Sequence, residues 1–173
     1  QSCFREVLLK DPKNRQALDG MRAIRQEWLA LARIEADKNN WQESVLGYQL
    51  VIGVEADDEI LEEALEVAKG LGNPKTIREF ERELALQKQK DRLAIANQHL
   101  ERAMMLEGKR QGSAAIQEYQ QSIIMLPQHK VFVQMLDCCR KFRLDNHAEQ
   151  LSEWFERVQE ADPEEEIPPL EID

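Results

Sequence analysis

The sequence has few of the residues that interrupt helices, with 7 glycines and 6 prolines among 173 residues, and few aromatic side chains. Both shortages argue against an all-β fold, which needs frequent turns and many strand-forming residues. The chain also lacks a run of eighteen apolar residues, so we expect no membrane-spanning segment. Charged residues are abundant. The composition favours a helix-rich chain, which at this length is expected to form one domain.

Cysteine is scarce as well, and Cys3, Cys138 and Cys139 are too few and odd in number for a disulfide framework. Neighbouring residues on a helix point about 100° apart, which places Cys138 and Cys139 poorly for binding one metal ion. We interpret both as buried small apolar residues. The three histidines have no metal-binding spacing, and no catalytic constellation is found. We therefore expect neither enzymatic activity nor a cofactor.

The net charge of −10 is unevenly distributed. Residues 160–173 hold seven of the 33 acidic residues and no basic one, whereas the other 26 acids nearly balance the 23 bases. The body of the chain therefore lacks the net positive charge with which proteins bind nucleic acids and anionic lipids, and we expect no nucleic-acid partner. Reduced thiols fit a cytoplasmic setting. The chain begins inside an expected helix, so we expect a segment of a longer protein, soluble or membrane-anchored, and localisation stays open.

One helical pattern recurs along the chain. Between Gly112 and Pro127, apolar and small residues recur every three or four positions, which predicts one buried face, and Pro127 ends the helix. That face consists of Ala115, Ile116, Tyr119, Ser122, Ile123 and Leu126. The same spacing, an aromatic residue eight positions before the residue that ends the helix, occurs four times. The four segments are Phe4–Pro12, Tyr48–Ala56, Tyr119–Pro127 and Phe155–Pro163. The pattern is therefore a repeat of helices.

Periodicity and turn signals predict further helices over residues 15–38, 41–55, 76–86, 96–109, 130–143 and 147–161. Asp57 or Asp58 is expected to cap a helix that ends at the turn 70–74, and Ser113 is expected to cap the helix that runs to Pro127. Residues 87–91 contain no Gly or Pro, so the two helices around them are expected to fuse. Met104 and Met105 fit a core or an adaptable binding surface, and we favour the core.

The segments Trp28-x2-Leu31-Ala32, Ser44–Tyr48 and Ala115–Tyr119 resemble the tetratricopeptide repeat, a pair of antiparallel helices of about 34 residues. The resemblance implies an all-α fold, a right-handed α-solenoid of stacked helical hairpins over residues 1–163, truncated at its N-terminus. An acidic, proline-containing tail follows at 164–173 and is expected to be extended and mobile.

The resemblance also implies a function: a protein-interaction scaffold that binds a peptide or partner helix in a concave groove lined by the first helix of each hairpin. The groove candidates are Arg33, Asp37, Asn97, Glu101, Met104, Gln134, Cys138 and Lys141. Some family members bind a C-terminal carboxylate through a lysine-and-asparagine clamp. Arg33 and Asn97 are suggestive of one, whereas Glu101, Met104 and Cys138 argue against it.

Two alternatives stay open. A helical array needs a polar cap at its end, and none follows Pro163. Either the tail residues Ile167, Leu170 and Ile172 fold back over that end, or another copy of the chain covers it, which would make self-assembly into a homo-oligomer the function. The second alternative is an enzyme or its regulatory arm, with a catalytic domain upstream; no residue of this chain supports it.

Overall fold

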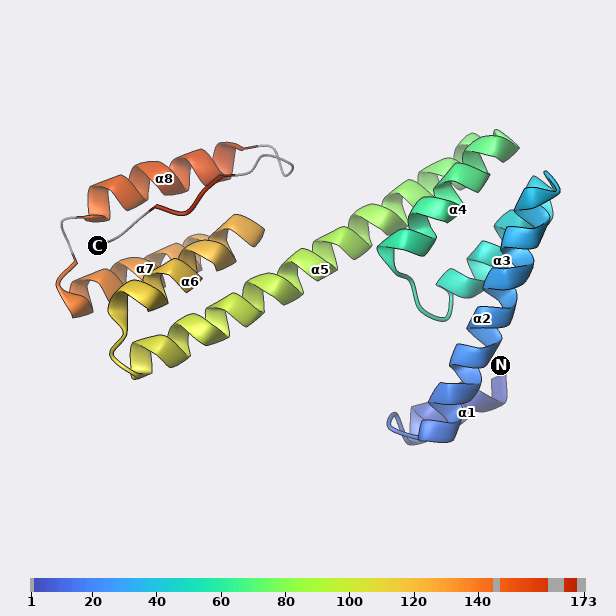
Figure 1. Ribbon diagram of the computed structural model, residues 1–173, viewed down its shortest axis with the longest axis horizontal. Helices are drawn as coiled ribbons and strands as arrows, with labels where there is room; N and C mark the ends of the chain where they lie inside the picture. Colours follow the sequence, from blue (N-terminus) through green and yellow to red (C-terminus); the bar gives the residue numbers. More distant parts are fainter. Residues whose placement is uncertain (1, 145–146, 162–166, 171–173) are drawn as a thin grey trace. The chain divides into compact units, whose positions relative to one another are not determined.

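The computed structural model describes residues 2–144, 147–161 and 167–170, which form eight helices and no strand (Figure 1). The helices are α1 Ser2–Lys10, α2 Arg15–Asp37, α3 Trp41–Ile52, α4 Asp58–Leu71, α5 Pro74–Gly108, α6 Gly112–Met125, α7 His129–Phe142 and α8 Ala148–Glu160. The prediction of an all-α fold is confirmed. Within these ranges, every helix is too short or too polar to cross a membrane.

The chain divides into two compact units, residues 1–88 and 89–173. Helix α5 crosses this boundary, so its first part belongs to unit 1 and its second part to unit 2. Its continuity confirms the predicted fusion across residues 87–91. The extent of the predicted repeat domain, residues 1–163, stays a prediction.

In unit 1, α2 packs against α1 and α3, and α3 packs against α4. Small residues allow α2 and α3 to approach closely. The hydroxyl of buried Ser44 donates a hydrogen bond to the carbonyl of Ala32 at 2.8 Å. A Cβ at Gly47 would lie 2.8 Å from the Cβ of Ala32, so a larger residue has no room there. The core of the unit consists of Ala32, Val45, Tyr48, Val51, Ile60, Ala64, Val67, Ala68 and Phe80.

Unit 2 has its own core, to which the second part of α5 and helices α6, α7 and α8 contribute. Phe132 of α7 and Phe155 of α8 stack with their ring centroids 4.2 Å apart and their planes 2° from parallel. Tyr119 is 2% exposed, and the predicted buried face of α6 is confirmed except at Leu126, which is half-buried. Cys138 and Cys139 are buried in this core, as predicted.

The two units repeat one another at a constant interval. Tyr48 corresponds to Tyr119, seventy-one positions later, and Ala32 corresponds to Ala103. The same interval relates further buried residues: Ser44, Val45, Val51, Ile60, Leu61, Ala64, Val67, Ala68 and Phe80 correspond to Ala115, Ile116, Ser122, Val131, Phe132, Met135, Cys138, Cys139 and Leu151. It also relates the left-handed residues Asn39 and Gly72 to Arg110 and Arg143. Helices α2, α3, α4 and early α5 thus correspond to late α5, α6, α7 and α8.

Several local predictions are wrong. Met104 and Met105 are 48% and 52% exposed, because α5 turns Leu100, Ala103 and Leu106 toward the core of unit 2 instead. Helix α6 begins at Gly112, so Ser113 lies inside its first turn and does not cap it. Helix α3 ends at Ile52, three residues before its predicted end. By contrast, Asp57 caps α4 as predicted, accepting a hydrogen bond from the Ile60 amide at 2.9 Å.

The last described residues, 167–170, lie against unit 2 rather than free of it. Ile167 is 8% exposed and belongs to the core of the unit, and Leu170 packs on that core. These residues therefore follow the fold-back alternative, and the expectation of a mobile tail is wrong for them because burying Ile167 anchors the segment. Ile172 and the predicted closing residue Pro163 lie outside the described residues.

Candidate functional site

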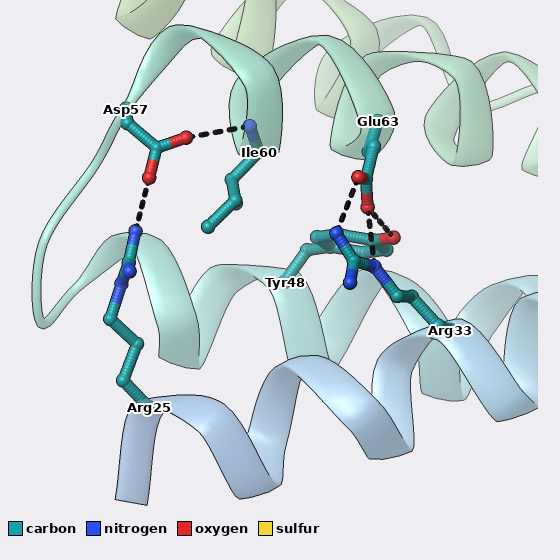
Figure 2. A network of polar contacts seen from close by, with 6 residues as sticks. All are labelled: Arg25, Arg33, Tyr48, Asp57, Ile60 and Glu63. Atoms are coloured by element: carbon teal, nitrogen blue, oxygen red, sulfur yellow. Dashed lines mark hydrogen bonds and ion pairs between the residues drawn. The ribbon is translucent and has the colours of Figure 1, made fainter. Parts of the chain in front are cut away.

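A buried tyrosine in unit 1 anchors a polar network that joins three consecutive helices (Figure 2). The Tyr48 hydroxyl of α3 donates a hydrogen bond to Glu63 Oε2 of α4 at 2.8 Å. Arg33 of α2 donates to the same carboxylate through Nη2 at 2.6 Å and through Nε at 2.9 Å. Such a bidentate arginine–carboxylate pair is stronger than an ion pair with a single hydrogen bond. The network thus ties α2 and α4 to the helix between them.

The network shifts the proton affinities of its members. Hydrogen bonding to Arg33 holds the pKa of Glu63 below its ordinary value, so the carboxylate stays ionised. Burial, followed by the hydrogen bond to Glu63, raises the pKa of Tyr48 to about 12. At neutral pH the acid and the guanidinium neutralise each other, and the tyrosine is a neutral donor. This arrangement holds helices together and offers no reactive group.

A second contact in unit 1 fixes the connection between α3 and α4. Arg25 of α2 donates through Nε to the carbonyl of Glu55 at 3.1 Å. It also forms an ion pair with Asp57, the residue that caps α4 (Figure 2). The free amides at a helix N-terminus carry partial positive charge, which Asp57 neutralises. Arg25 therefore fastens this connection to α2.

Unit 2 contains a related network around its own tyrosine. Tyr119 of α6 donates to Glu107 Oε2 of α5 at 3.1 Å, and Lys141 of α7 approaches Glu107 Oε1 at 2.7 Å. The hydrogen bond from Lys141 lowers the pKa of Glu107, and burial raises that of Tyr119. Burial also raises the pKa of the nearby Cys138 thiol to about 11, which keeps it protonated and unreactive.

The predicted groove residues are divided between the units. Arg33 and Asp37 lie on α2 in unit 1, whereas the other six lie in unit 2: Asn97, Glu101 and Met104 on α5, and Gln134, Cys138 and Lys141 on α7. Asp37, Asn97, Glu101 and Met104 are exposed. Arg33 and Lys141 are already held by Glu63 and Glu107.

Two of these predicted residues are not freely accessible. Cys138 is 1% exposed, so its side chain is removed from any groove, because the α7 face that carries it packs into the core. Gln134 is half-buried, and its Oε1 has no hydrogen-bond partner among the described residues.

A cleft of about 610 Å³ lies in unit 1 between α3 and the turn that joins α4 to α5. Its lining residues are all uncharged: Gln42, Val45, Leu46, Gln49, Leu71, Gly72, Asn73, Pro74 and Thr76. The Gly72 backbone is left-handed, with φ of 70°, and this conformation turns the chain into the wall of the cleft. Leu46 is 55% exposed, which is high for a large apolar side chain.

This cleft was not predicted from the sequence. Its α3 wall is formed by Gln42, Val45, Leu46 and Gln49, which follow helical spacing and so share one side of the helix. The sequence carries no signal that singles out this side of the helix, because the exposure of Leu46 is known only from the structure. The opposite wall comes from a turn that is distant in sequence, and no local pattern indicates their proximity.

Comparison with protein-family models, curated proteins and solved structures finds no match to this chain.

Proposed function

We propose that this chain is a non-catalytic protein-interaction scaffold, built as a solenoid of tetratricopeptide-like hairpins, that binds a peptide segment of another protein. The constant interval between equivalent buried residues of the two units supports a repeat architecture. The close approach of α2 and α3 at Ala32 supports the hairpin assignment, because small residues at that point admit the neighbouring helix.

The observation that carries the proposal is the uncharged cleft beside α3. It is a broad, open depression of about 610 Å³, which can accept a few side chains of a peptide. Leu46, Leu71 and Pro74 offer apolar contact. The amides of Gln42 and Gln49 can both donate to and accept from a peptide backbone. The lining therefore suits an uncharged peptide segment.

Selection of peptides from a display library on the full chain tests the proposal. Leu46→Glu places a charge inside the cleft, and Leu50→Glu is its matched control, since Leu50 is similarly exposed on α3 but does not line the cleft. We expect Leu46→Glu to weaken the selected peptides at least tenfold and Leu50→Glu to leave their affinity unchanged. Equal effects of the two variants would remove the cleft from the proposal.

The same selection tests the groove that the resemblance implies. Met104→Glu alters an exposed position on α5 that belongs to the predicted groove set. Loss of binding in this variant alone would keep the scaffold function and move the site to the groove. Failure to recover any peptide that binds more tightly than about 1 mM would refute the scaffold function itself.

Self-assembly into a homo-oligomer is the second proposed function. The contacts of the tail argue against assembly in which the tail of one copy binds to another copy. Ile167 and Leu170 already pack on their own unit, so these apolar side chains do not need another copy of the chain in order to be buried. Sedimentation at increasing concentration decides the matter. A constant monomer mass, for the intact chain and for a chain ending at Pro163, would exclude assembly.

A further inference from the structure

The segment Ile167–Leu170 lies on unit 2 in the manner of a bound peptide. Its two ends point inward: Ile167 is 8% exposed within the core, and Leu170 is half-buried against it. The two prolines between them are exposed. The segment is neither helix nor strand, so side-chain burial rather than a backbone ladder holds it in place.

Trp154 of α8 gives this segment a directed polar contact. The indole is 4% exposed, and its Nε1–H donates a hydrogen bond to the carbonyl oxygen of Pro168 at 3.0 Å. A tryptophan side chain can only donate, and a proline residue offers only its carbonyl, so the two groups are complementary. Aromatic grooves that recognise extended proline-rich peptides rely on the low entropy cost of binding a preformed polyproline conformation.

The segment is joined to α8, which ends at Glu160, through residues 161–166. A ligand tied to its site by so short a connection has an effective concentration of order millimolar. An identical untethered segment therefore displaces the tethered one only when its concentration approaches millimolar. A partner segment with additional contacts is needed to displace it below that concentration, which favours a different protein over a second copy of this chain.

We propose that the surface of unit 2 beneath Ile167–Leu170 is a binding site for an extended apolar-Pro-Pro-apolar segment of a partner protein, and that the chain's own tail occupies it until displaced. The contacts that hold the tail are the buried Ile167 at one end, the half-buried Leu170 at the other and the Pro168 carbonyl that accepts from the Trp154 indole N–H. Any peptide of this pattern reproduces them. The site belongs to unit 2, so it goes beyond the cleft of unit 1 and is tested independently.

Detaching the tail in the full chain tests this inference. Ile167→Asp with Leu170→Asp places charges where the tail is buried, and Leu9→Asp with Leu31→Asp is the matched control, which adds the same charge at two exposed leucines of unit 1. The probe is a synthetic peptide with the sequence of residues 164–173, titrated by calorimetry. We expect it to bind the detached-tail variant at least tenfold more tightly than the wild type or the control, in which the tail competes.

The indole contact has its own readout. Trp154→Phe, added to the detached-tail variant, retains an aromatic ring and removes the N–H donor. We expect the peptide to bind about fivefold more weakly, the loss typical of one hydrogen bond. Peptide affinity that is equal with and without the indole N–H would refute the assigned recognition.

A measurement on the wild-type chain keeps the inference testable if the detached-tail variant fails to fold. Millimolar peptide should displace the tail and shift the NMR signals of the Ile167 and Leu170 methyl groups toward those of an unfolded chain. Absence of displacement, or absence of binding to a folded detached-tail variant, would overturn the proposal. Dimers of the wild type formed by exchange of tails would also overturn it, in favour of a second copy as the occupant.

Discussion

Tyr48 and Tyr119 hold equivalent positions in the two units, yet their hydroxyls are satisfied from opposite directions along the chain. The acceptor of Tyr48 is Glu63, on the helix that follows, whereas the acceptor of Tyr119 is Glu107, on the helix that precedes. A basic residue from the remaining neighbour then pairs with each carboxylate. The two units thus use different residues to provide a hydrogen-bond acceptor for the buried tyrosine hydroxyl and to link three helices.

The Tyr48 hydroxyl is expected to stabilise the folded state. Tyr48→Phe keeps the packing of the ring and removes the bond to Glu63, so we expect the free energy of unfolding in urea to fall by about 1–2 kcal/mol. Tyr119→Phe should act in the same direction. If the phenylalanine variants match or exceed the wild type in stability, the networks contribute nothing to it.

The raised pKa of Tyr48 predicts a loss of stability in alkali. The unfolded chain releases the phenol proton near pH 10, whereas the folded protein holds it to about pH 12. The contribution of this group to the free energy of unfolding is therefore complete below pH 10 and is lost between pH 10 and 12. Tyrosinate absorbance and urea unfolding at each pH measure the two effects. A Tyr48→Phe variant whose stability falls with pH as steeply as that of the wild type would contradict the prediction.

Gly72 and Arg143 occupy equivalent positions, and both have a left-handed backbone conformation. Replacing the glycine should therefore lower the stability of the protein, and introducing a glycine should raise it. Gly72 has φ of 70° and Arg143 has φ of 62°. Gly72→Ala introduces a Cβ into a left-handed conformation and should cost about 1–2 kcal/mol, while Arg143→Gly should stabilise by about 1 kcal/mol or less. Thermal unfolding of the two variants beside the wild type measures both. Changes of the same sign would refute the shared conformation.

Gln120 on α6 is fully buried, and neither its Oε1 nor its Nε2 has a hydrogen-bond partner among the described residues. Replacing a buried unpaired amide with an apolar side chain of similar size removes a desolvation cost. We expect Gln120→Leu to raise the free energy of unfolding by about 1–2 kcal/mol. The control is Gln117→Leu on the exposed side of the same helix, which should change it by less than about 0.5 kcal/mol.

The cysteines should differ sharply in reactivity. Cys3 is exposed, whereas Cys138 and Cys139 are buried and the Cys138 thiol has a pKa of about 11. Because the thiolate is the reactive form, a thiol reagent should modify Cys3 rapidly in the folded protein and the other two only on unfolding. Mass spectrometry of a time course, with Cys3→Ser as the control, resolves the rates. Rapid labelling of the Cys3→Ser variant would show that the α7 face is open.

Local patterns predicted most of the helices because their signals are local. The spacing of apolar residues located the buried face of α6, Asp57 marked the start of α4, and the glycine at 72 marked its end. Met104 and Met105 were misassigned because an apolar residue fits several faces of a long helix. Only the neighbouring helices determine which face of α5 is covered.

Candidate sites were harder to predict than helices. Nothing near Trp154 in the sequence identifies the carbonyl of Pro168 as its acceptor, since the two residues are fourteen positions apart. The cleft beside α3 likewise depends on a turn more than twenty residues away along the chain. The groove residues were assigned by resemblance, and that alignment placed Cys138 in the groove although its small apolar side chain had been predicted, correctly, to be buried.

Local sequence patterns are sufficient to predict that this protein is helical, where most of its helices begin and end, and that Tyr119 is buried, because periodicity, capping residues and turn residues act over a few positions. Which charged side chains form ion pairs with one another can be seen only in the tertiary structure. Arg33 and Glu63 are thirty positions apart, and Lys141 and Glu107 thirty-four. Such pairs form only after packed helices have fixed the distances between their side chains.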